Sequence, residues 1–197
     1  MTLDCHALLI GFVAEVIAMN TVKGALVLER IVHFDMRVCG YFNRHVEKRR
    51  IRKFFAVISR LGDGPLWYGL IVLIPVMFGR ENIHVSLRMA AAGLSGLIIY
   101  KLIKKITERP RPFVKSISIV PGTAPLDQYS FPSGHTLHAV CFTLIAIHYL
   151  PGLSWVLVPF AFLVAMSRVV LGLHYPSDVL VGASIGTGLA VVFVSYI

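Results

Sequence analysis

Three basic side chains have the type and spacing of an oxyanion-binding site. Lys104 and Arg111 lie seven residues apart, which is two turns of a helix, and Arg168 follows later inside an apolar region. Cations gathered around one pocket are costly unless an anion is bound there. Arginine offers planar two-point contacts to phosphate oxygens, and lysine offers a point charge. These residues therefore predict a phosphate-binding pocket.

A helix N-terminus is predicted at Ser133 and Gly134, because Pro132 suits the first positions of a helix. Free N–H groups and the helix dipole favour an anion at such an end. Gly134 lets the backbone approach that anion closely, and the Ser133 hydroxyl can donate a further hydrogen bond. We expect both residues to bind phosphate oxygens.

A nucleophile is predicted at His174, four residues before Asp178. Pro176 suits the first turn of the last apolar segment, so His174 should lie at a helix entrance with Asp178 inside the first turn. A carboxylate there can accept a proton from one imidazole nitrogen, which fixes the tautomer and frees the other nitrogen to attack. His135 is then available as a general acid for the leaving oxygen.

The other histidines and basic residues have plainer interpretations. Histidines beside apolar segments usually serve ordinary packing, and basic residues at the ends of such segments usually contact lipid headgroups. Arg109-Pro110 resembles Arg111-Pro112, but only Arg111 lies seven residues after Lys104. Headgroup anchoring therefore suffices for Lys101, Lys105, Arg109 and Lys115.

The composition indicates a membrane protein. Of the 197 residues, 56% are hydrophobic and only 15% are charged, against about 45–50% and about 25% in soluble domains. The net charge of +9 is concentrated in residues 44–60 and 101–115, where lipid headgroups are the expected contact. No aromatic or groove-reading element accompanies these clusters, so nucleic-acid binding is not expected. The cysteines show no zinc or disulfide spacing, and we expect no metal and no cofactor.

The apolar segments predict an all-α, multi-pass bundle of about six helices that span or lie in the membrane. Residues 1–60 form an amphipathic region, in which residues 3–28 are a doubtful first span and residues 34–58 a basic interfacial helix. Residues 61–197 form the helical catalytic core of the same single domain. Five clearer spans are expected there, at residues 66–79, 86–103, 137–150, 153–171 and 178–197. If these spans alternate, the turn at 62–65, the loop 104–130 and residues 169–177 share one side of the membrane. The three clusters then meet on one face.

The clusters together resemble the three-part signature of the type-2 phosphatidic acid phosphatase superfamily. Its members include lipid phosphate phosphatases, bacterial acid phosphatases and vanadium haloperoxidases. The resemblance rests on Lys104-x6-Arg111-Pro112, Pro132-Ser133-Gly134-His135 and Ser167-Arg168-x5-His174-x3-Asp178. It covers most of the chain beyond Gly62 and implies a haloperoxidase-like core.

The resemblance also implies roles for these residues. His174 attacks phosphorus and becomes a phosphohistidine, oriented by Asp178, while His135 protonates the leaving group. Water then releases phosphate. The remaining signature residues bind the phosphoryl oxygens without a metal: Lys104, Arg111, Ser133, Gly134 and Arg168.

Hydrolysis of a membrane-lipid phosphate is the function that these features favour. Phosphatidylglycerol phosphate, phosphatidic acid, undecaprenyl diphosphate and lipid A phosphates all remain open as substrates. Transfer of the phosphoryl group to a second lipid uses the same intermediate, and an anion transporter or channel lined by the cations is a further alternative.

The expected location is the bacterial cytoplasmic membrane. The excess of Lys and Arg on the active-site face favours a cytoplasmic site, whereas the resemblance to bacterial relatives favours a periplasmic one. Phosphate binding itself accounts for part of that charge, so we expect the periplasmic side.

Overall fold

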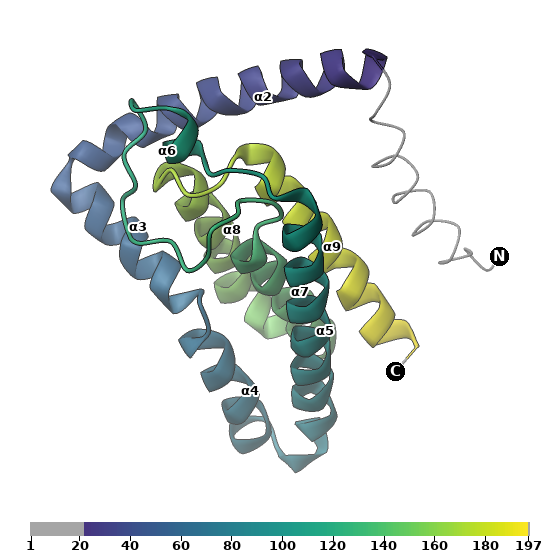
Figure 1. Ribbon diagram of the computed structural model, residues 1–197. Coiled ribbons are helices and arrows are strands. Elements are labelled where there is room, and N and C mark those ends of the chain that lie inside the picture. The colour runs from purple at the N-terminus through teal and green to yellow at the C-terminus, as the bar shows by residue number, and fades with distance from the viewer. Residues whose placement is uncertain (1–21, 197) are drawn as a thin grey trace.

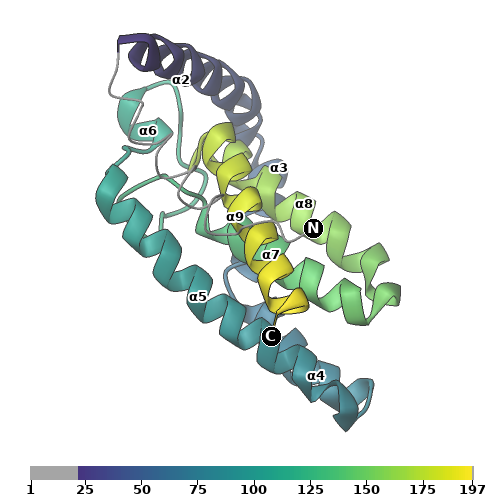
Figure 2. The same ribbon diagram turned by 90° about the vertical axis from the view of Figure 1, so that its right-hand side faces the viewer.

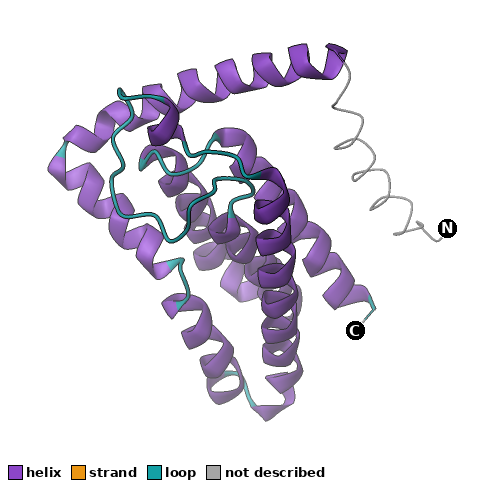
Figure 3. Cartoon of the chain, viewed as in Figure 1, coloured by secondary structure: helices purple, strands orange, loops and turns teal. Residues whose placement is uncertain are grey.

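The computed structural model describes residues 22–196, all of which form helices and the loops between them (Figure 3). Figure 1 follows the chain through these elements. The long helices are α2 (Val22–Asn43), α3 (Arg49–Leu61), α4 (Pro65–Met77), α5 (Ile83–Thr107), α7 (Gly134–Tyr149), α8 (Ser154–Val170) and α9 (Pro176–Ser195). Shorter pieces are η1 (Arg44–Glu47), η2 (Arg80–Asn82), α6 (Pro112–Lys115) and η3 (Pro151–Leu153). The expected all-α fold is confirmed.

The N-terminal region differs from its prediction. The doubtful span at residues 3–28 lies mostly outside the described residues. The single interfacial helix expected at 34–58 is instead two helices, α2 and α3, joined by the 3₁₀ turn η1. Asn43 ends α2 because its side-chain amide donates to the carbonyls of Val120 and Val170, at 2.9 and 3.0 Å. Its amide oxygen also accepts from the Val120 N–H at 2.8 Å, so α2 is fastened to two later loops.

Helix α7 lies at the centre of the bundle, packed against α5, α8 and α9 (Figure 2). Two glycines let α9 approach it closely. A Cβ at Gly182 would lie 2.5 Å from the Ser133 carbonyl oxygen, and one at Gly186 would lie 2.4 Å from that of Leu137. Both glycines therefore lie at the contact between α7 and α9. Gly188 lies away from it, because a Cβ there would meet nothing within 4 Å.

The helices differ in their ability to cross a bilayer. Three candidate spans are long and apolar enough: Arg80–Lys115, Pro151–Val170 and Pro176–Ser195. Helices α3 and α4, bent by 47° at a short break, count as a fourth if they form one span. Helix α7 has 16 residues, or about 24 Å at 1.5 Å per residue, which is shorter than a typical hydrocarbon core. Its central position surrounds it with protein rather than lipid.

All three sequence clusters lie at one end of the bundle. The C-terminus of α5, the N-terminus of α7 and the α8–α9 connection meet there, and α2 and the loop around α6 run across the same end (Figure 1). Arg111 Nη1 donates to the Leu173 carbonyl at 2.7 Å, and the Ser133 N–H donates to the Asp178 carbonyl at 3.0 Å. The convergence expected from alternating spans is therefore present.

Candidate active site

A cavity of about 660 Å³ opens at this end of the bundle. Its polar wall carries the three cations that the sequence singled out, Lys104, Arg111 and Arg168. These residues are 6%, 2% and 3% exposed. Charged groups are seldom buried so deeply without a partner. The groups around each cation therefore indicate how its charge is balanced.

Arg168 retains an unused hydrogen-bond donor. Its Nη1 donates to the Ser59 hydroxyl of α3, a buried contact, whereas its Nε is buried without any hydrogen-bond partner in the described structure. An unsatisfied buried donor costs free energy. Arg168 is therefore incompletely paired within the described residues.

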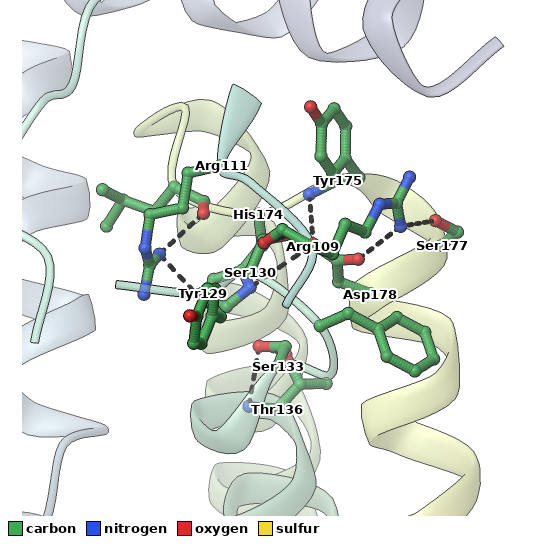
Figure 4. A network of polar contacts seen from close by, with 12 residues as sticks. Arg109, Arg111, Tyr129, Ser130, Ser133, Thr136, His174, Tyr175, Ser177 and Asp178 are labelled. Atoms are coloured by element: carbon green, nitrogen blue, oxygen red, sulfur yellow. Dashed lines mark hydrogen bonds and ion pairs between the residues drawn. The ribbon is translucent and has the colours of Figure 1, made fainter. Parts of the chain in front are cut away.

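Ser133 and Gly134, the two predicted phosphate-binding residues at the N-terminus of α7, have different surroundings. Gly134 lines the cavity, and a Cβ there would lie 3.3 Å from the Tyr100 ring. Ser133 is the N-cap, and its hydroxyl accepts from the Thr136 N–H at 3.4 Å and contacts Thr136 Oγ1 at 3.0 Å (Figure 4). In this geometry the Ser133 hydroxyl shapes the helix end and lies behind the cavity wall.

His174 presents one ring nitrogen to Asp178 and the other to the cavity. Nδ1 lies 3.6 Å from Asp178 Oδ2, which is longer than a well-formed hydrogen bond. Catalytic contacts of this kind often tighten when substrate binds. Nε2 lies 3.5 Å from Arg111 Nη1, on the side of the ring away from Asp178.

The environment of His174 favours a neutral ring. Burial lowers its pKa well below the ordinary value, and the neighbouring cations, Arg168 first, lower it further. A neutral imidazole has a free lone pair on the nitrogen that lacks the proton. The surroundings of His174 therefore favour the uncharged form of its ring.

His135 lies beside Asp63, which belongs to the turn expected at residues 62–65. Its Nε2 is 3.3 Å from Oδ1 of Asp63, in the break between α3 and α4. Both residues line the cavity. The local sequence at Asp63 indicates only a turn, because Gly62, Gly64 and Pro65 predict one whatever residue lies between them. Its place on the active-site side of the alternating spans was the available signal.

Asp127 forms ion pairs with two of the three cations. Lys104 Nζ lies 2.7 Å from both of its carboxylate oxygens, and Arg111 Nη2 donates to Oδ1, also at 2.7 Å. Burial would raise the pKa of Asp127, but hydrogen bonds and attraction from Lys104 and Arg111 outweigh it and hold the pKa below the ordinary value. An ionised carboxylate therefore neutralises part of the positive charge on this wall of the cavity.

Replacing Asp127 with asparagine is expected to tighten the binding of inorganic phosphate. The carboxylate competes with phosphate for the same donors, and a half-exposed pair of this kind is worth about 1 kcal/mol or less. The inhibition constant for phosphate should therefore fall roughly three- to fivefold. Gln128→Ala, a change at the exposed neighbouring position, should leave it unchanged. Unchanged or weaker phosphate inhibition of Asp127→Asn would contradict competition by this carboxylate.

The opposite half of the cavity is apolar. Aromatic and aliphatic side chains of α4 and α5 line it, among them Trp67, Ile71, Leu94 and Leu97. Pockets that place a few polar groups at one end of an apolar cleft suit amphiphilic ligands. The cavity therefore matches a molecule with an anionic head and a hydrocarbon chain.

Comparison with known proteins accords with this geometry. The model of the PAP2 superfamily matches residues 85–197, more than half of the chain. The chain belongs to the PAP2 superfamily. Within this family, undecaprenyl-diphosphatase BcrC of Bacillus subtilis is 35% identical over 57% of this chain and 58% of its own length. Phosphatidylglycerophosphatase B of the same organism is 34% identical over 66% of each chain. The matches thus span less than two thirds of these relatives.

A solved PAP2 structure covers more of the fold. The crystal structure of a transmembrane PAP2-type phosphatidylglycerolphosphate phosphatase from Bacillus subtilis superposes with a TM-score of 0.70 at 26% identity. The match covers 96% of this chain and 94% of that one. Together with the apolar spans, this likeness establishes the chain as a membrane protein of the PAP2 superfamily.

Proposed function

We propose that this protein hydrolyses a phosphomonoester or diphosphate on a membrane lipid. The observation that carries the proposal is the cavity itself, which joins a cluster of buried cations and two histidines to an apolar channel between α4 and α5. A soluble phosphate ester needs no such channel. Lipid-phosphate relatives of the PAP2 family support the same substrate class.

The proposed reaction proceeds in two displacements. Nε2 of His174 attacks phosphorus, a P–N bond forms, and the bond from phosphorus to the lipid oxygen breaks. His135 gives its proton to that oxygen, so the lipid leaves as an alcohol or as a lipid phosphate. His135 then takes a proton from water, whose oxygen attacks phosphorus, and the P–N bond breaks to release phosphate.

The cations and the α7 N-terminus are placed to stabilise the charge that develops during these steps. Lys104, Arg111 and Arg168 line the same wall as Gly134, and preorganised donors of this kind usually supply the largest part of catalysis. We therefore propose that turnover needs no metal, with these side chains in the role of a metal ion. Asp178 lies behind His174 as its orienting group.

A substrate panel in detergent tests the proposal. Phosphatidic acid, phosphatidylglycerol phosphate, undecaprenyl diphosphate and a lipid A phosphate are each incubated with purified protein, and released phosphate is measured with and without a chelator. We expect phosphate release from at least one lipid and no effect of the chelator. Radiolabel on a second lipid instead of free phosphate would indicate a phosphotransferase. No reaction with any lipid would overturn the proposal, and loss of turnover with chelator would overturn its metal-free part.

We infer that the site opens on the outer face of the cytoplasmic membrane, the side that the resemblance of the sequence clusters implies. Ser118→Cys tests this, because Ser118 is exposed on the loop after α6 whereas Cys39 and Cys141 are buried. In a Cys5→Ser background, a membrane-impermeant maleimide should label Ser118→Cys in intact cells. Gly152→Cys, exposed in the opposite connection, should react only after lysis. The reverse labelling pattern would place the site in the cytoplasm.

A further inference from the structure

We propose that Arg109 and Asp35 are positioning residues for the nucleophile, acting on His174 through Asp178. The inference rests on the proposed phosphatase function and extends it to a helix, α2, that lies outside the region matched by the family model. It also changes the interpretation of Arg109, which the sequence favoured as a headgroup anchor.

Arg109 bridges two buried carboxylates. Its Nη1 lies 2.5 Å from Asp178 Oδ1, and its Nη2 lies 2.8 Å from Asp35 Oδ2. The carboxylates are 0% and 1% exposed, whereas the Arg109 side chain is 19% exposed. Figure 4 shows the guanidinium group directed toward Asp178 and Ser177 at the start of α9. Both contacts are charge-assisted hydrogen bonds, the stronger class.

The contacts leave Asp178 little freedom. Oδ1 is held by Arg109, while Oδ2 accepts from the Tyr175 N–H at 2.9 Å and faces His174 Nδ1. Arg109 is itself held from both ends. Its carbonyl accepts from the Ser130 N–H at 2.8 Å, and its guanidinium carbon lies 4.1 Å from the centre of the Tyr175 ring. A fixed carboxylate fixes the imidazole that it faces.

Helix α2 completes this arrangement from the other side. Asp35 Oδ1 accepts from the Ser177 N–H at 3.0 Å, and Oδ2 accepts from the Ser177 hydroxyl. One turn later, Cys39 Sγ donates to the His174 carbonyl at 3.3 Å. Helix α2 therefore contacts both His174 and Ser177, the residue directly before Asp178.

The charges explain why two carboxylates are present. Arg109 alone would neutralise Asp178, and its positive charge would oppose the positive charge that grows on His174 as phosphorus is attacked. Asp35 shares the guanidinium, so the group of three keeps a net charge of −1 behind the imidazole. That charge faces the three cations across the ring, and it stabilises the phosphohistidine on the Nδ1 side.

Neither proposed residue touches the cavity. Arg109 and Asp35 are absent from its lining among the described residues, whereas Lys104 and Arg111 from the same segment line it. Variants of these two residues should therefore affect turnover without affecting substrate binding. Losing Arg109 or Asp35 should slow the chemical step and leave the affinity for substrate and for phosphate unchanged.

The experiment compares Asp35→Asn, Arg109→Gln and Arg109→Lys with Lys105→Gln, which removes an exposed positive charge from the same helix end. On a lipid that the wild type hydrolyses, kcat should fall about 10- to 100-fold in the first two variants, with KM and the phosphate inhibition constant within about twofold. Arg109→Lys should keep part of the activity because the charge remains. Lys105→Gln should match the wild type.

A double-mutant cycle separates positioning from a loss of folding. If Arg109 acts through Asp178, adding Arg109→Gln to Asp178→Asn should lower kcat by less than about twofold further, whereas independent effects multiply. Wild-type kcat in Asp35→Asn and Arg109→Gln, a rise in KM alone, or a multiplicative cycle would each overturn the inference. Thermal unfolding of each variant shows whether it is folded. If Arg109→Gln does not fold, Arg109→Lys replaces it in the cycle. Inactivity of the wild type toward every lipid phosphate would instead remove the proposed function.

Discussion

Replacing His174 with glutamine is expected to lower kcat on a lipid phosphate by at least about 10⁴-fold, because the nucleophile is lost and no second group can take its place. The side chain is 1% exposed, and glutamine fills a similar volume while still offering a hydrogen bond toward Asp178. The cavity wall should therefore survive the change. Phosphate should still bind, since its cationic partners are unaltered.

Trapping of the intermediate makes this test specific. Wild-type protein mixed briefly with a ³²P-labelled lipid phosphate and quenched in alkali should retain label in a form that acid releases, as expected for a phosphoramidate. His174→Gln should retain none. His148→Gln is the matched control, because His148 is exposed at the far end of α7. Label persisting in His174→Gln would assign the nucleophile elsewhere.

The helical core could be predicted closely because its signals are local. Apolar runs bounded by Gly62–Pro65, by Arg80–Asn82 and by Pro151-Gly152 mark helix ends directly, and α4, α5, α8 and α9 lie near the expected ranges. The N-terminal helices were less predictable. Their break at η1 depends on Asn43 reaching Val120 and Val170, and such long-range contacts leave no trace in hydrophobic periodicity.

Six of the eight predicted site residues line one cavity, as expected from their spacing and from the alternation of spans, whereas Ser133 and Asp178 do not reach it. The groups that hold them were not predictable. Asp127 and Asp35 sit in a loop and an amphipathic helix where a carboxylate is unremarkable, and only the fold brings them to Lys104 and Arg109. These two pairings can be recognised only from the structure, where a buried cation requires an opposite charge nearby. The catalytic roles themselves stay predictions.

Arg109 shows the limit of motif spacing. The repeated Arg-Pro pairs were correctly separated, since Arg111 lines the cavity, but the remaining arginine was then assigned to lipid headgroups. Burial decides otherwise. A guanidinium between two carboxylates that are almost wholly buried cannot serve as a surface anchor. The spacing from Lys104 distinguishes Arg111 as the arginine of the cavity wall. It gives no information on the structural role of Arg109.

Replacing His135 with alanine should lower kcat by roughly 10²- to 10⁴-fold on a lipid phosphate, the usual contribution of a general acid. The lipid oxygen is a poor leaving group and needs a proton as its bond to phosphorus breaks. His135 lies on the cavity wall, 3.3 Å from Asp63. Burial, with Arg168 next, lowers its pKa well below the ordinary value, so the role of proton donor requires the negative charge of a bound phosphate to raise that pKa again. Asp63→Asn should produce a smaller loss, because the donor remains and only its partner changes.

Substrates with different leaving groups distinguish the loss of a proton donor in His135→Ala from a general disruption of the cavity. An aryl phosphate with an electron-withdrawing substituent, such as p-nitrophenyl phosphate, releases an oxygen that departs as a stable anion. The loss of activity in His135→Ala should therefore be about tenfold or less on that substrate. His174→Gln should lose activity on both substrates alike, because every substrate needs the nucleophile. The loss of a general acid should slow a substrate with a poor leaving group more than one with a good leaving group. An equal loss on both substrates in His135→Ala would therefore show that His135 is not the proton donor.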